Sequence, residues 1–507
     1  MAGLMRMVVV SNRLPVVLER EGETWQVRPG SGGLVTALSP LLRQRGGLWI
    51  GWPGVRADES AGVESHLAEY SGAAGFEVVP VALTAEDVGG FYHGFSNEII
   101  WPLFHDLQTR CNFVPEYWTT YRAVQGKFAE VVRQQARERD FIWVHDYHLM
   151  GLGRQLRRRE ALNRIGFFLH TPFPPPDIFL KLPWRAEVLE ELLDYDVLGF
   201  QTPRDRDNFA ACVRHLLPRA RLRRKRGVIR VQQPGRSVHV DALPIGIDHA
   251  EFAARAAAPS VTARVRELRA QIADQQIVLS VDRLDYTKGI PYRLKAFRTA
   301  LERYPDLHRQ VTLFQLVVPS REAVPEYQDS RAEVEQLVGQ VNGQFTEPGW
   351  IPIHHVFRPV ERDELLALYR TADVGLVTPL KDGMNLVAKE YCACQVEGDG
   401  VLILSEFAGA AVQLGRHALL VNPYDLDGVA AALHQAVRTP RAARHAAMRH
   451  LRTNIRRYDV HWWAEQFLKA SGLAVAATPA GPGLPTKHAL PVTPTGAVPQ
   501  DFEACTS

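Results

Sequence analysis

The stretch ADVGLVTPLKDGMNLVAKE, residues 372–390, joins a short apolar run to a polar turn and then to a helical pattern. Its apolar run has no polar face, which is typical of a parallel strand covered by helices on both sides. Gly383 permits a tight turn, and the first free N–H groups of the following helix favour a negatively charged ligand such as a diphosphate. The stretch therefore predicts a strand, a turn and a helix that form an anion-binding edge.

The same alternation of apolar runs and helical patterns occurs on both sides of a break near ALPIGIDHAEF, residues 242–252. It predicts an α/β fold with two facing Rossmann-like domains and a deep inter-domain cleft. The expected parts are a first domain over residues 1–245, a second over 246–455, a helix over 456–470 that packs back on the first domain, and a disordered Pro/Ala/Gly-rich tail over 471–507. The basic stretch PRARLRRKRGVIR, residues 218–230, reads as a solvated hairpin or helix end.

The composition is that of a soluble globular protein. The chain has 507 residues, 46% of them hydrophobic and 23% charged, and a net charge of +3. This near balance gives no argument for nucleic acid or a membrane surface as a partner. Five cysteines in so long a chain do not make a disulfide framework. No apolar run reaches the roughly 18 residues of a membrane span, and the first strand-like run begins too early for a signal peptide. We expect a cytoplasmic protein.

Charged side chains follow many of the predicted strands. In parallel α/β sheets, ligands bind beyond the carboxyl ends of the strands, so these side chains are candidates for a binding site. They are Arg13, Asp146, His170, Arg283 with Lys288 five residues later, Arg321, and Asp382. Arginine binds phosphate as a two-pronged donor and lysine binds it as a point charge. Several such cations together predict a phosphorylated ligand.

Two carboxylates flank the turn at Gly383. Asp382 and Glu390 are eight residues apart, which corresponds to about 12 Å along a helix. Carboxyl pairs that hydrolyse glycosides lie roughly 5 to 9.5 Å apart. The spacing favours binding over hydrolysis, with Asp382 on a sugar hydroxyl and Glu390 on the two hydroxyls of a ribose. A glycine loop at Gly30, Gly32 and Gly33 also precedes a helix, but it lacks the P-loop pattern.

A set of motifs in chain order resembles the trehalose-6-phosphate synthase family. They are VVVSNRLPV, GGLVTAL, YHGFSNEIIWPLFH, VHDYHLM, FFLHTPFPPPDIF, VDRLDYTKGI, PSRE, DGMNLVAKEY and LSEFAGAA, and they span about residues 7 to 470. The resemblance implies a retaining glycosyltransferase of the GT-B type without a cofactor. It would transfer glucose from a nucleotide-glucose, expected to be UDP-glucose, to glucose 6-phosphate in the first step of trehalose biosynthesis.

The resemblance also implies two subsites. The acceptor, glucose 6-phosphate, would contact Arg13, Tyr92, Trp101, Asp146 and Arg321. The donor would contact Gly32, Gly33, His170, Arg283, Lys288, Val360, Asp382, Gly383, Met384, Asn385, Leu386, Val387, Ala388, Lys389 and Glu390. Of these residues, His170, Arg283, Lys288 and Asp382 would serve the chemistry, with the two cations on the diphosphate.

In this family the acceptor attacks on the face from which the diphosphate leaves, so no protein nucleophile is needed. The sequence contains no convincing nucleophile–base pair. The DYD triplet, residues 194–196, resembles a metal-holding motif of other glycosyltransferases, but it precedes its strand and so lies away from the ligand edge. The HDYH run, residues 145–148, places neighbouring side chains in diverging directions, so we expect no metal site there either.

Two other functions stay open. One is a GT-B enzyme with a different phosphorylated acceptor, and the other is a catalytically silent sensor of sugar phosphate. The sequence does not decide between UDP, ADP and GDP as the donor nucleotide, and it leaves a homo-oligomer open.

Overall fold

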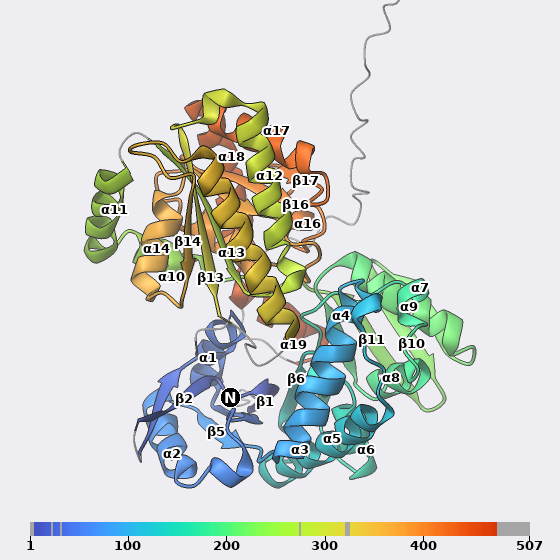
Figure 1. Cartoon of the computed structure of the whole chain (residues 1–507). Coiled ribbons are helices and arrows are strands. Elements are labelled where there is room, and N and C mark those ends of the chain that lie inside the picture. Colours follow the sequence, from blue (N-terminus) through green and yellow to red (C-terminus); the bar gives the residue numbers. More distant parts are fainter. Residues whose placement is uncertain (1–4, 22–23, 31–32, 273–274, 320–324, 474–507) are drawn as a thin grey trace, which may run out of the picture.

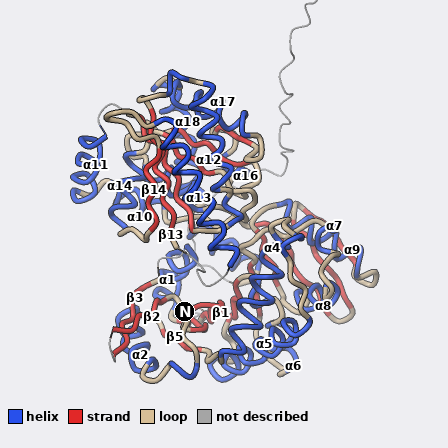
Figure 2. Tube along the Cα trace, viewed as in Figure 1, coloured by secondary structure: helices blue, strands red, loops and turns tan. Residues whose placement is uncertain are grey.

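The computed structural model describes residues 5–21, 24–30, 33–272, 275–319 and 325–473 and consists of two α/β halves (Figure 1). Each half has its own sheet with helices packed around it, as the red strands and blue helices of Figure 2 show. The predicted pair of Rossmann-like folds is confirmed. Most of the predicted tail lies outside the described residues, as do the candidate ligands Gly32 and Arg321.

The sheet of the first half has the strand order β5-β4-β1-β6-β7-β8-β11-β10-β9 over the described residues. The strands from β5 to β11 in this order run parallel. They are β5 (Glu77–Pro80), β4 (Gly47–Trp52), β1 (Met7–Arg13), β6 (Phe141–His145), β7 (Ile165–Phe168), β8 (Val197–Phe200) and β11 (Arg236–Ala242). Strands β1 and β6 are buried along almost their whole length, which explains their continuous apolar runs.

The far edge of this sheet is antiparallel, which the expectation of a parallel sheet did not include. Strands β10 (Val228–Gln233) and β9 (Arg221–Lys225) pair antiparallel with β11 and with each other. They contain most of the basic stretch, and of its two expected forms, a solvated hairpin or a helix end, the structure has the hairpin. Strand β9 is mostly exposed, and its charged side chains disfavour pairing with another chain at this edge. A separate hairpin is formed by β2 (Val16–Glu21) and β3 (Thr24–Pro29).

The sheet of the second half is parallel throughout its described strands, in the order β14-β13-β12-β15-β16-β17. These are β14 (Ile353–Phe357), β13 (Val311–Val318), β12 (Gln276–Arg283), β15 (Val374–Val377), β16 (Val401–Ser405) and β17 (Leu419–Val421). Because β12 and β15 are neighbours, the residues that follow them lie side by side at one edge of the sheet. The same holds for β1, β6 and β7 in the first half.

Helices occupy the connections between the strands. The first half contains α1 (Gly33–Arg45), α2 (Val63–Ala74), α3 (Ala85–Asp87), the π-helix η2 (Val88–Ile100), α4 (Trp101–Phe104), α5 (Pro115–Gln135), α6 (Leu152–Arg158), α7 (Pro176–Phe179), α8 (Arg185–Leu192) and α9 (Pro203–Leu216). The second half contains α10 (His249–Ala256), α11 (Pro259–Ile272), α12 (Ile290–Arg303), α13 (Pro325–Phe345), α14 (Arg362–Thr371), α15 (Leu386–Cys394), α16 (Ala411–Leu414), α17 (Leu426–Arg438) and α18 (Arg441–Arg457). Short 3-10 turns are η1 (Ala57–Glu59), η3 (Gln108–Arg110), η4 (Tyr147–Leu149), η5 (Tyr286–Lys288) and η6 (Pro305–Leu307).

The last described helix, α19 (Val460–Ala470), connects the two halves. It follows α18 of the second half but packs on the first sheet, where Trp463 and Phe467 lie 5.0 and 4.4 Å from Trp143 between ring centroids. Figure 1 shows α19 between the two halves. Its buried side chains belong to one continuous apolar cluster that extends from the first sheet into the second half. Burial of this helix therefore stabilises one arrangement of the halves.

Candidate active site

The turn after β15 holds the carboxylate of Asp382 in place. The backbone N–H of Met384 donates to it at 3.3 Å, and the side-chain amide of Asn385 donates at 3.2 Å. Asn385 has a left-handed φ of 73° and caps α15 by accepting from the N–H of Ala388 at 3.1 Å. Asparagine tolerates this backbone region better than most residues, and its side chain satisfies a helix N–H. The predicted strand, turn and helix are thus confirmed.

A buried ion pair lies at this turn. The Nζ of Lys288, from η5, lies 2.6 Å from an Oδ of Asp382, and both side chains are 14% exposed. Burial opposes ionisation of Asp382, but the charge of Lys288 and its hydrogen bond outweigh burial, and the pKa of Asp382 is lowered. Burial likewise opposes the charge on Lys288, and Asp382 and Asp285 outweigh it, so its pKa is raised. The pair therefore stays charged near neutral pH.

A second buried ion pair, between Arg293 and Asp282, stabilises the end of β12. Arg293 donates to Asp282 at 2.6 Å and, through Nε, to the hydroxyl of Thr378 at 3.0 Å. This guanidinium thereby connects the ends of β12 and β15. Arg283, the next residue after Asp282, is exposed, and its charge acts on both Lys288 and Asp146.

Two neighbouring strand ends of the first half supply Asp146 and His170. The N–H of His170 donates to Asp146 at 3.1 Å, and Asp146 has a left-handed φ of 73°. Burial raises the pKa of Asp146 to about 6 against the opposing effect of backbone hydrogen bonds. Burial also lowers the pKa of His170 to about 3. One ring nitrogen of His170 lies 3.1 Å from Nδ1 of His145. At neutral pH His170 is thus an uncharged hydrogen-bonding group.

Arg13 lies at the end of β1 beside an aromatic group. Its guanidinium carbon is 4.6 Å from the ring centroid of Trp52 and covers Gly54, where a Cβ would overlap it. Tyr92 packs edge-on against the same Trp52 at 5.6 Å. The exposed guanidinium therefore rests on a fixed aromatic surface. Trp101, at the start of α4, is buried and packs against Tyr147 at 5.7 Å.

The strand ends of the two halves meet. Gly383 is buried so closely against His170 that a Cβ would overlap the carbonyl oxygen of His170. Lys381 forms an ion pair with Asp106 of the first half. We call this meeting region the domain junction. Arg13, Asp146 and His170 follow strands of one sheet, and Arg283, Lys288 and Asp382 follow strands of the other.

The start of α15 contributes mostly backbone to the junction. Leu386 and Val387 are half-buried and pack against the apolar cluster, and Ala388 is buried. Lys389 points to the connection between the halves, where its Nζ donates to the carbonyl of Ile245 at 2.6 Å and to Gln413 at 2.6 Å. Burial lowers the pKa of Lys389 to about 7. Its side chain is therefore engaged in a structural contact and is no free cation for a ligand.

The middle of the same helix carries Glu390. It accepts a hydrogen bond from the hydroxyl of Tyr369 at 3.1 Å, and burial raises its pKa. Val360, after β14, is half-buried and packs against the apolar cluster. The helix expected after the glycine loop is α1, and Gly33 is its first residue instead of preceding it.

Sequence reasoning missed His105 and Asp106. His105 is the last residue of the quoted motif YHGFSNEIIWPLFH, and Asp106 is the next residue. Both follow a short helix instead of a strand, so the position of strand ends did not select them. Asp106 pairs with Lys381 across the junction, and the charges of Asp382 and Lys288 act on the ring of His105. A charged residue with positive φ, such as Asp106 at 62°, marks such a corner only once the backbone is known.

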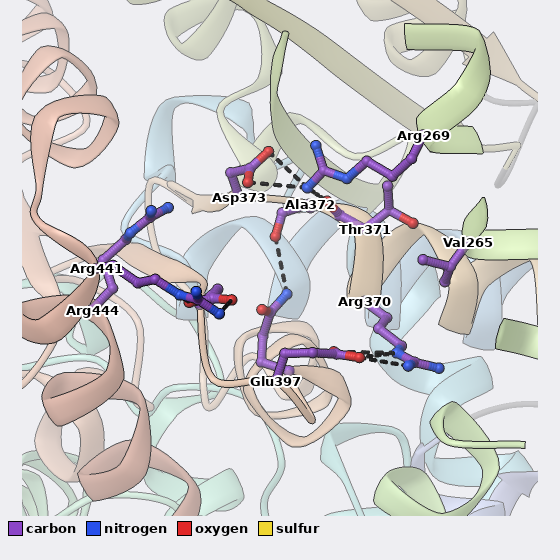
Figure 3. Close-up of a pocket in the computed structure, with 11 residues that line it drawn as sticks. Val265, Arg269, Arg370, Thr371, Ala372, Asp373, Glu397, Arg441 and Arg444 are labelled. Carbon is purple, nitrogen blue, oxygen red and sulfur yellow. Dashed lines mark hydrogen bonds and ion pairs between the residues drawn. The ribbon is translucent and has the colours of Figure 1, made fainter. Parts of the chain in front are cut away.

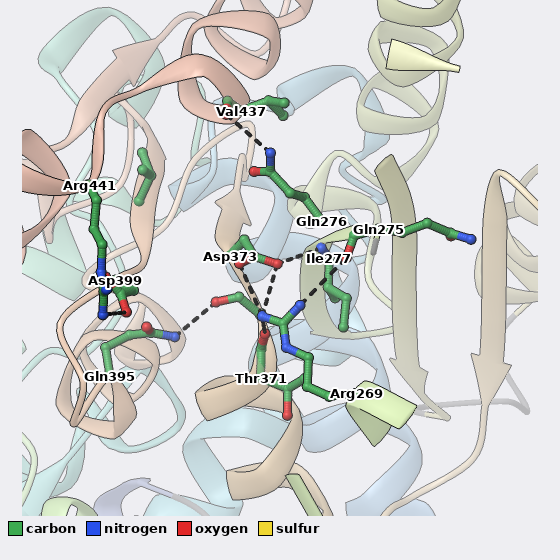
Figure 4. Close-up of polar contacts among 12 residues, drawn as sticks. Arg269, Gln275, Gln276, Ile277, Thr371, Asp373, Gln395, Asp399, Val437 and Arg441 are labelled. Atoms are coloured by element: carbon green, nitrogen blue, oxygen red, sulfur yellow. Dashed lines mark hydrogen bonds and ion pairs between the residues drawn. The ribbon is translucent and has the colours of Figure 1, made fainter. Parts of the chain in front are cut away.

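A cavity of about 320 Å³ lies at the opposite, amino edge of the second sheet (Figure 3). Arginines line it, but three of them are paired with carboxylates: Arg269 with Asp373 at 3.0 Å, Arg370 with Glu397 at 3.0 Å, and Arg441 with Asp399 at 2.9 Å. Asp373 also accepts from the N–H of Ile277 at 2.8 Å (Figure 4). The first pair fastens α11 to the start of β15, and the other two fasten α14 and α18 to the loop between α15 and β16. We therefore assign this cavity a structural role.

The DYD motif, residues 194–196, is one of the two motifs at which we expected no metal site, and its aspartates pair with arginines. Asp194 and Asp196 accept from Arg154 and Arg157, each at 2.7 Å, and Asp196 lies at the amino end of β8 as predicted. Within the described ranges, no group of three or more His, Cys, Asp or Glu side chains could hold a metal ion.

None of the helices that the structure describes has the length and apolar character that crossing a membrane requires.

Two facing α/β domains whose charged strand ends meet at one junction define a glycosyltransferase of the GT-B fold class. The chain belongs to glycosyltransferase family 20, whose family model matches residues 5–471.

Relatives cover nearly the whole chain. The trehalose-6-phosphate synthase of Mycolicibacterium smegmatis is 44% identical over 497 residues, which are 94% of this chain and 96% of that one. That of Mycobacterium tuberculosis is 42% identical over 490 residues, 94% of this chain and 96% of the other. An α,α-trehalose-phosphate synthase (UDP-forming) from Burkholderia xenovorans, in complex with glucose-6-phosphate, superposes with a TM-score of 0.83 at 36% identity, covering 92% of this chain and 100% of that chain. A protein from E. coli bound with UDP-2-fluoro glucose has a TM-score of 0.82 at 37% identity, covering 93% and 99%.

Replacement of Gly383 by alanine should disrupt the junction. The new Cβ would overlap the His170 carbonyl, so the two halves must move apart by a fraction of an ångström or more. A misplacement of about 1 Å can cost about 100-fold in rate, and we expect a loss of that order in transferase activity. The far-ultraviolet circular dichroism spectrum should stay unchanged.

The matched control is Gly339→Ala in the middle of α13, where a Cβ would meet no atom within 4 Å. This change should leave activity intact and stabilise the protein by about 0.5 to 1 kcal/mol. Full activity of Gly383→Ala would contradict the close approach of the two halves.

The raised pKa of Asp146 predicts a pH-dependent stability difference. With a native pKa of about 6 and an ordinary value near 4, the native state binds more protons than the unfolded state between these pH values. Stability from this group is therefore present below about pH 4 and is lost as pH rises through 6. Asp146→Asn lacks this loss, so its melting temperature relative to wild type should rise by about 2 °C or more from pH 4 to pH 7.

Differential scanning calorimetry of both proteins across this range provides the measurement. The difference should level off above pH 7, where Asp146 is ionised in both states. A difference that is flat, or that falls with rising pH, would show that the carboxyl is not held in its neutral form.

Proposed function

We propose that this chain transfers glucose, with retention of configuration, from a nucleotide-glucose to glucose 6-phosphate, giving α,α-trehalose 6-phosphate and a nucleoside diphosphate. The observation that carries the proposal is the Lys288–Asp382 ion pair in the turn before α15, where the next residue, Gly383, packs against His170 of the other half. The chain's identity of 44% and 42% to two trehalose-6-phosphate synthases, over 96% of the length of each, supports it. Structures of similar enzymes with glucose-6-phosphate and with a UDP-sugar analogue support the two substrate classes.

The donor would bind mainly to the second domain, which we propose begins near residue 246. Arg283 and Lys288 would meet the diphosphate, together with N–H groups of the first turn of α15. Asp382 and the uncharged His170 would hold hydroxyl groups of the glucose. Glu390 would accept hydrogen bonds from the ribose, and the backbone near Val360 would meet the base.

The acceptor would bind to the first domain. Arg13 would act as a two-pronged donor to the 6-phosphate, which suits a guanidinium fixed against Trp52. Tyr92, Trp101 and Asp146 would complete this subsite. Arg321 stays a prediction for the same phosphate, because it lies outside the described residues.

The reaction requires charge stabilisation more than covalent catalysis. As the bond between the anomeric carbon and the phosphate oxygen breaks, its electron pair moves to the diphosphate. Arg283 and Lys288 would stabilise that charge where it develops. The acceptor hydroxyl would attack from the same face and pass its proton to the departing phosphate oxygen. Asp382, which Lys288 keeps ionised, would face the positive charge that develops on the sugar.

An assay of nucleoside diphosphate release tests the function. Protein, UDP-glucose and glucose 6-phosphate are mixed, and the disaccharide product is identified by nuclear magnetic resonance. Release should require the acceptor and yield the α,α-linked product. ADP- and GDP-glucose in parallel reactions establish the donor base. Turnover only with another phosphorylated sugar would favour the alternative transferase, and tight binding without turnover would favour a sensor.

Arg283→Ala should cost roughly 2 to 5 kcal/mol of transition-state binding, because a charge that meets the diphosphate is lost. This corresponds to a fall in kcat/KM for the donor of about 30-fold to several thousand-fold. Steady-state kinetics with saturating glucose 6-phosphate measure it. Arg303→Ala, which removes an exposed ion pair with Asp427 in the same half, should change little. Unchanged turnover and donor KM in Arg283→Ala would refute the assignment.

We also propose a cytoplasmic location.

A further inference from the structure

His105 occupies a tight corner directly after α4. Its side chain is 4% exposed, and its ring packs on Trp101 with a centroid distance of 4.2 Å. Its Nδ1 lies 2.7 Å from the carbonyl oxygen of Trp101. A carbonyl oxygen can only accept a hydrogen bond, so Nδ1 carries the hydrogen and donates it.

The other ring nitrogen, Nε2, is then an acceptor. Burial lowers the pKa of His105 to about 4, so the ring is neutral near pH 7 and has a single N–H. Among the described residues no group donates a hydrogen bond to Nε2. Nε2 is not fully shielded from solvent, so a ligand hydroxyl can reach it and donate a hydrogen bond to it.

The corner faces the reacting groups of the other half. Asp106, the next residue, pairs with Lys381, which immediately precedes Asp382. The charges of Asp285, Asp382 and Lys288 all act on the His105 ring. Because Nδ1 is tied back to α4, the opposite edge of the ring, which carries Nε2, points away from that helix.

We propose that His105 is a further substrate-binding residue whose Nε2 accepts a hydrogen bond from a sugar hydroxyl at the domain junction. The inference rests on the proposed function. The proximity of Lys288 and Asp382 favours a hydroxyl of the transferred glucose over one of the acceptor. The Asp106–Lys381 ion pair positions the corner, and a neutral acceptor selects for a hydroxyl donor over a phosphate oxygen, which could not donate.

The first test separates the binding role of His105 from its structural role. In His105→Asn the side-chain amide can still donate to the Trp101 carbonyl, but no atom replaces Nε2. We expect kcat/KM to fall about tenfold, as for one lost hydrogen bond, with an unchanged melting temperature. His105→Gln, whose longer side chain can place an oxygen near the Nε2 position, should recover part of the loss.

A matched control is His308→Gln. His308 lies in the second half, away from the junction, and its Nε2 lies 2.8 Å from the carbonyl of Leu301. Glutamine can keep this hydrogen bond, so kcat/KM should equal that of the wild type.

The second test identifies the hydroxyl. Wild type and His105→Asn are compared with nucleotide-glucose donors, and with glucose 6-phosphate acceptors, that each lack one hydroxyl. For one analogue the tenfold difference between the two proteins should vanish, because the partner of Nε2 is already absent. We expect this analogue to be one of the nucleotide-glucose donors. If it is a glucose 6-phosphate analogue, Nε2 of His105 still accepts a hydrogen bond from a substrate hydroxyl, but that hydroxyl belongs to the other sugar.

Two results would overturn the proposal: His105→Asn with wild-type kcat/KM, or an equal loss with every analogue, which would mean that the residue acts only through Trp101. If the wild-type protein shows no turnover, the proposed function fails separately. The comparison is then made by calorimetric binding of UDP-glucose and its deoxy analogues to both proteins.

Discussion

The buried ion pair between Lys288 and Asp382 is the contact on which the junction depends. Neither charge would be stable alone at this depth, because burial opposes ionisation of both groups. Their mutual attraction, together with hydrogen bonds from Met384 and Asn385, holds the carboxylate in one position. The pair also joins two neighbouring strands of the second sheet at the point where the other half approaches.

Around this pair, burial keeps the imidazole groups neutral. His170 and His105 both have pKa values far below the ordinary value, and the cause is the same loss of water around the rings. The junction thus combines fixed charges from lysine, arginine and aspartate with uncharged hydrogen-bonding rings. Such a division suits a ligand with a charged diphosphate and neutral sugar hydroxyls, since each part would meet groups of matching chemistry.

The relative position of the halves depends on contacts far apart in the chain. Helix α19 buries Trp463 against the first sheet, Gly383 touches the backbone of His170, and Lys389 donates to the carbonyl of Ile245 at the connection. Two of these contacts involve backbone atoms, which cannot move without their strands. The junction is therefore held by packing and backbone contact, and the charged pair between Lys381 and Asp106 adds to it.

The amino-acid sequence by itself determined the alternating strands and helices, the turn at Gly383 and the strand-end residues Arg13, Asp146, His170, Arg283, Lys288 and Asp382, because strand periodicity and the geometry of parallel sheets are local properties. It also carried the family's motifs. Only the tertiary structure decided that Lys288 pairs with Asp382, that Lys389 turns away toward Ile245, and that His105 and Asp106 face the other half. These outcomes depend on which surfaces come together over hundreds of residues, and burial there sets charge and hydrogen bonding in a way that no local pattern encodes.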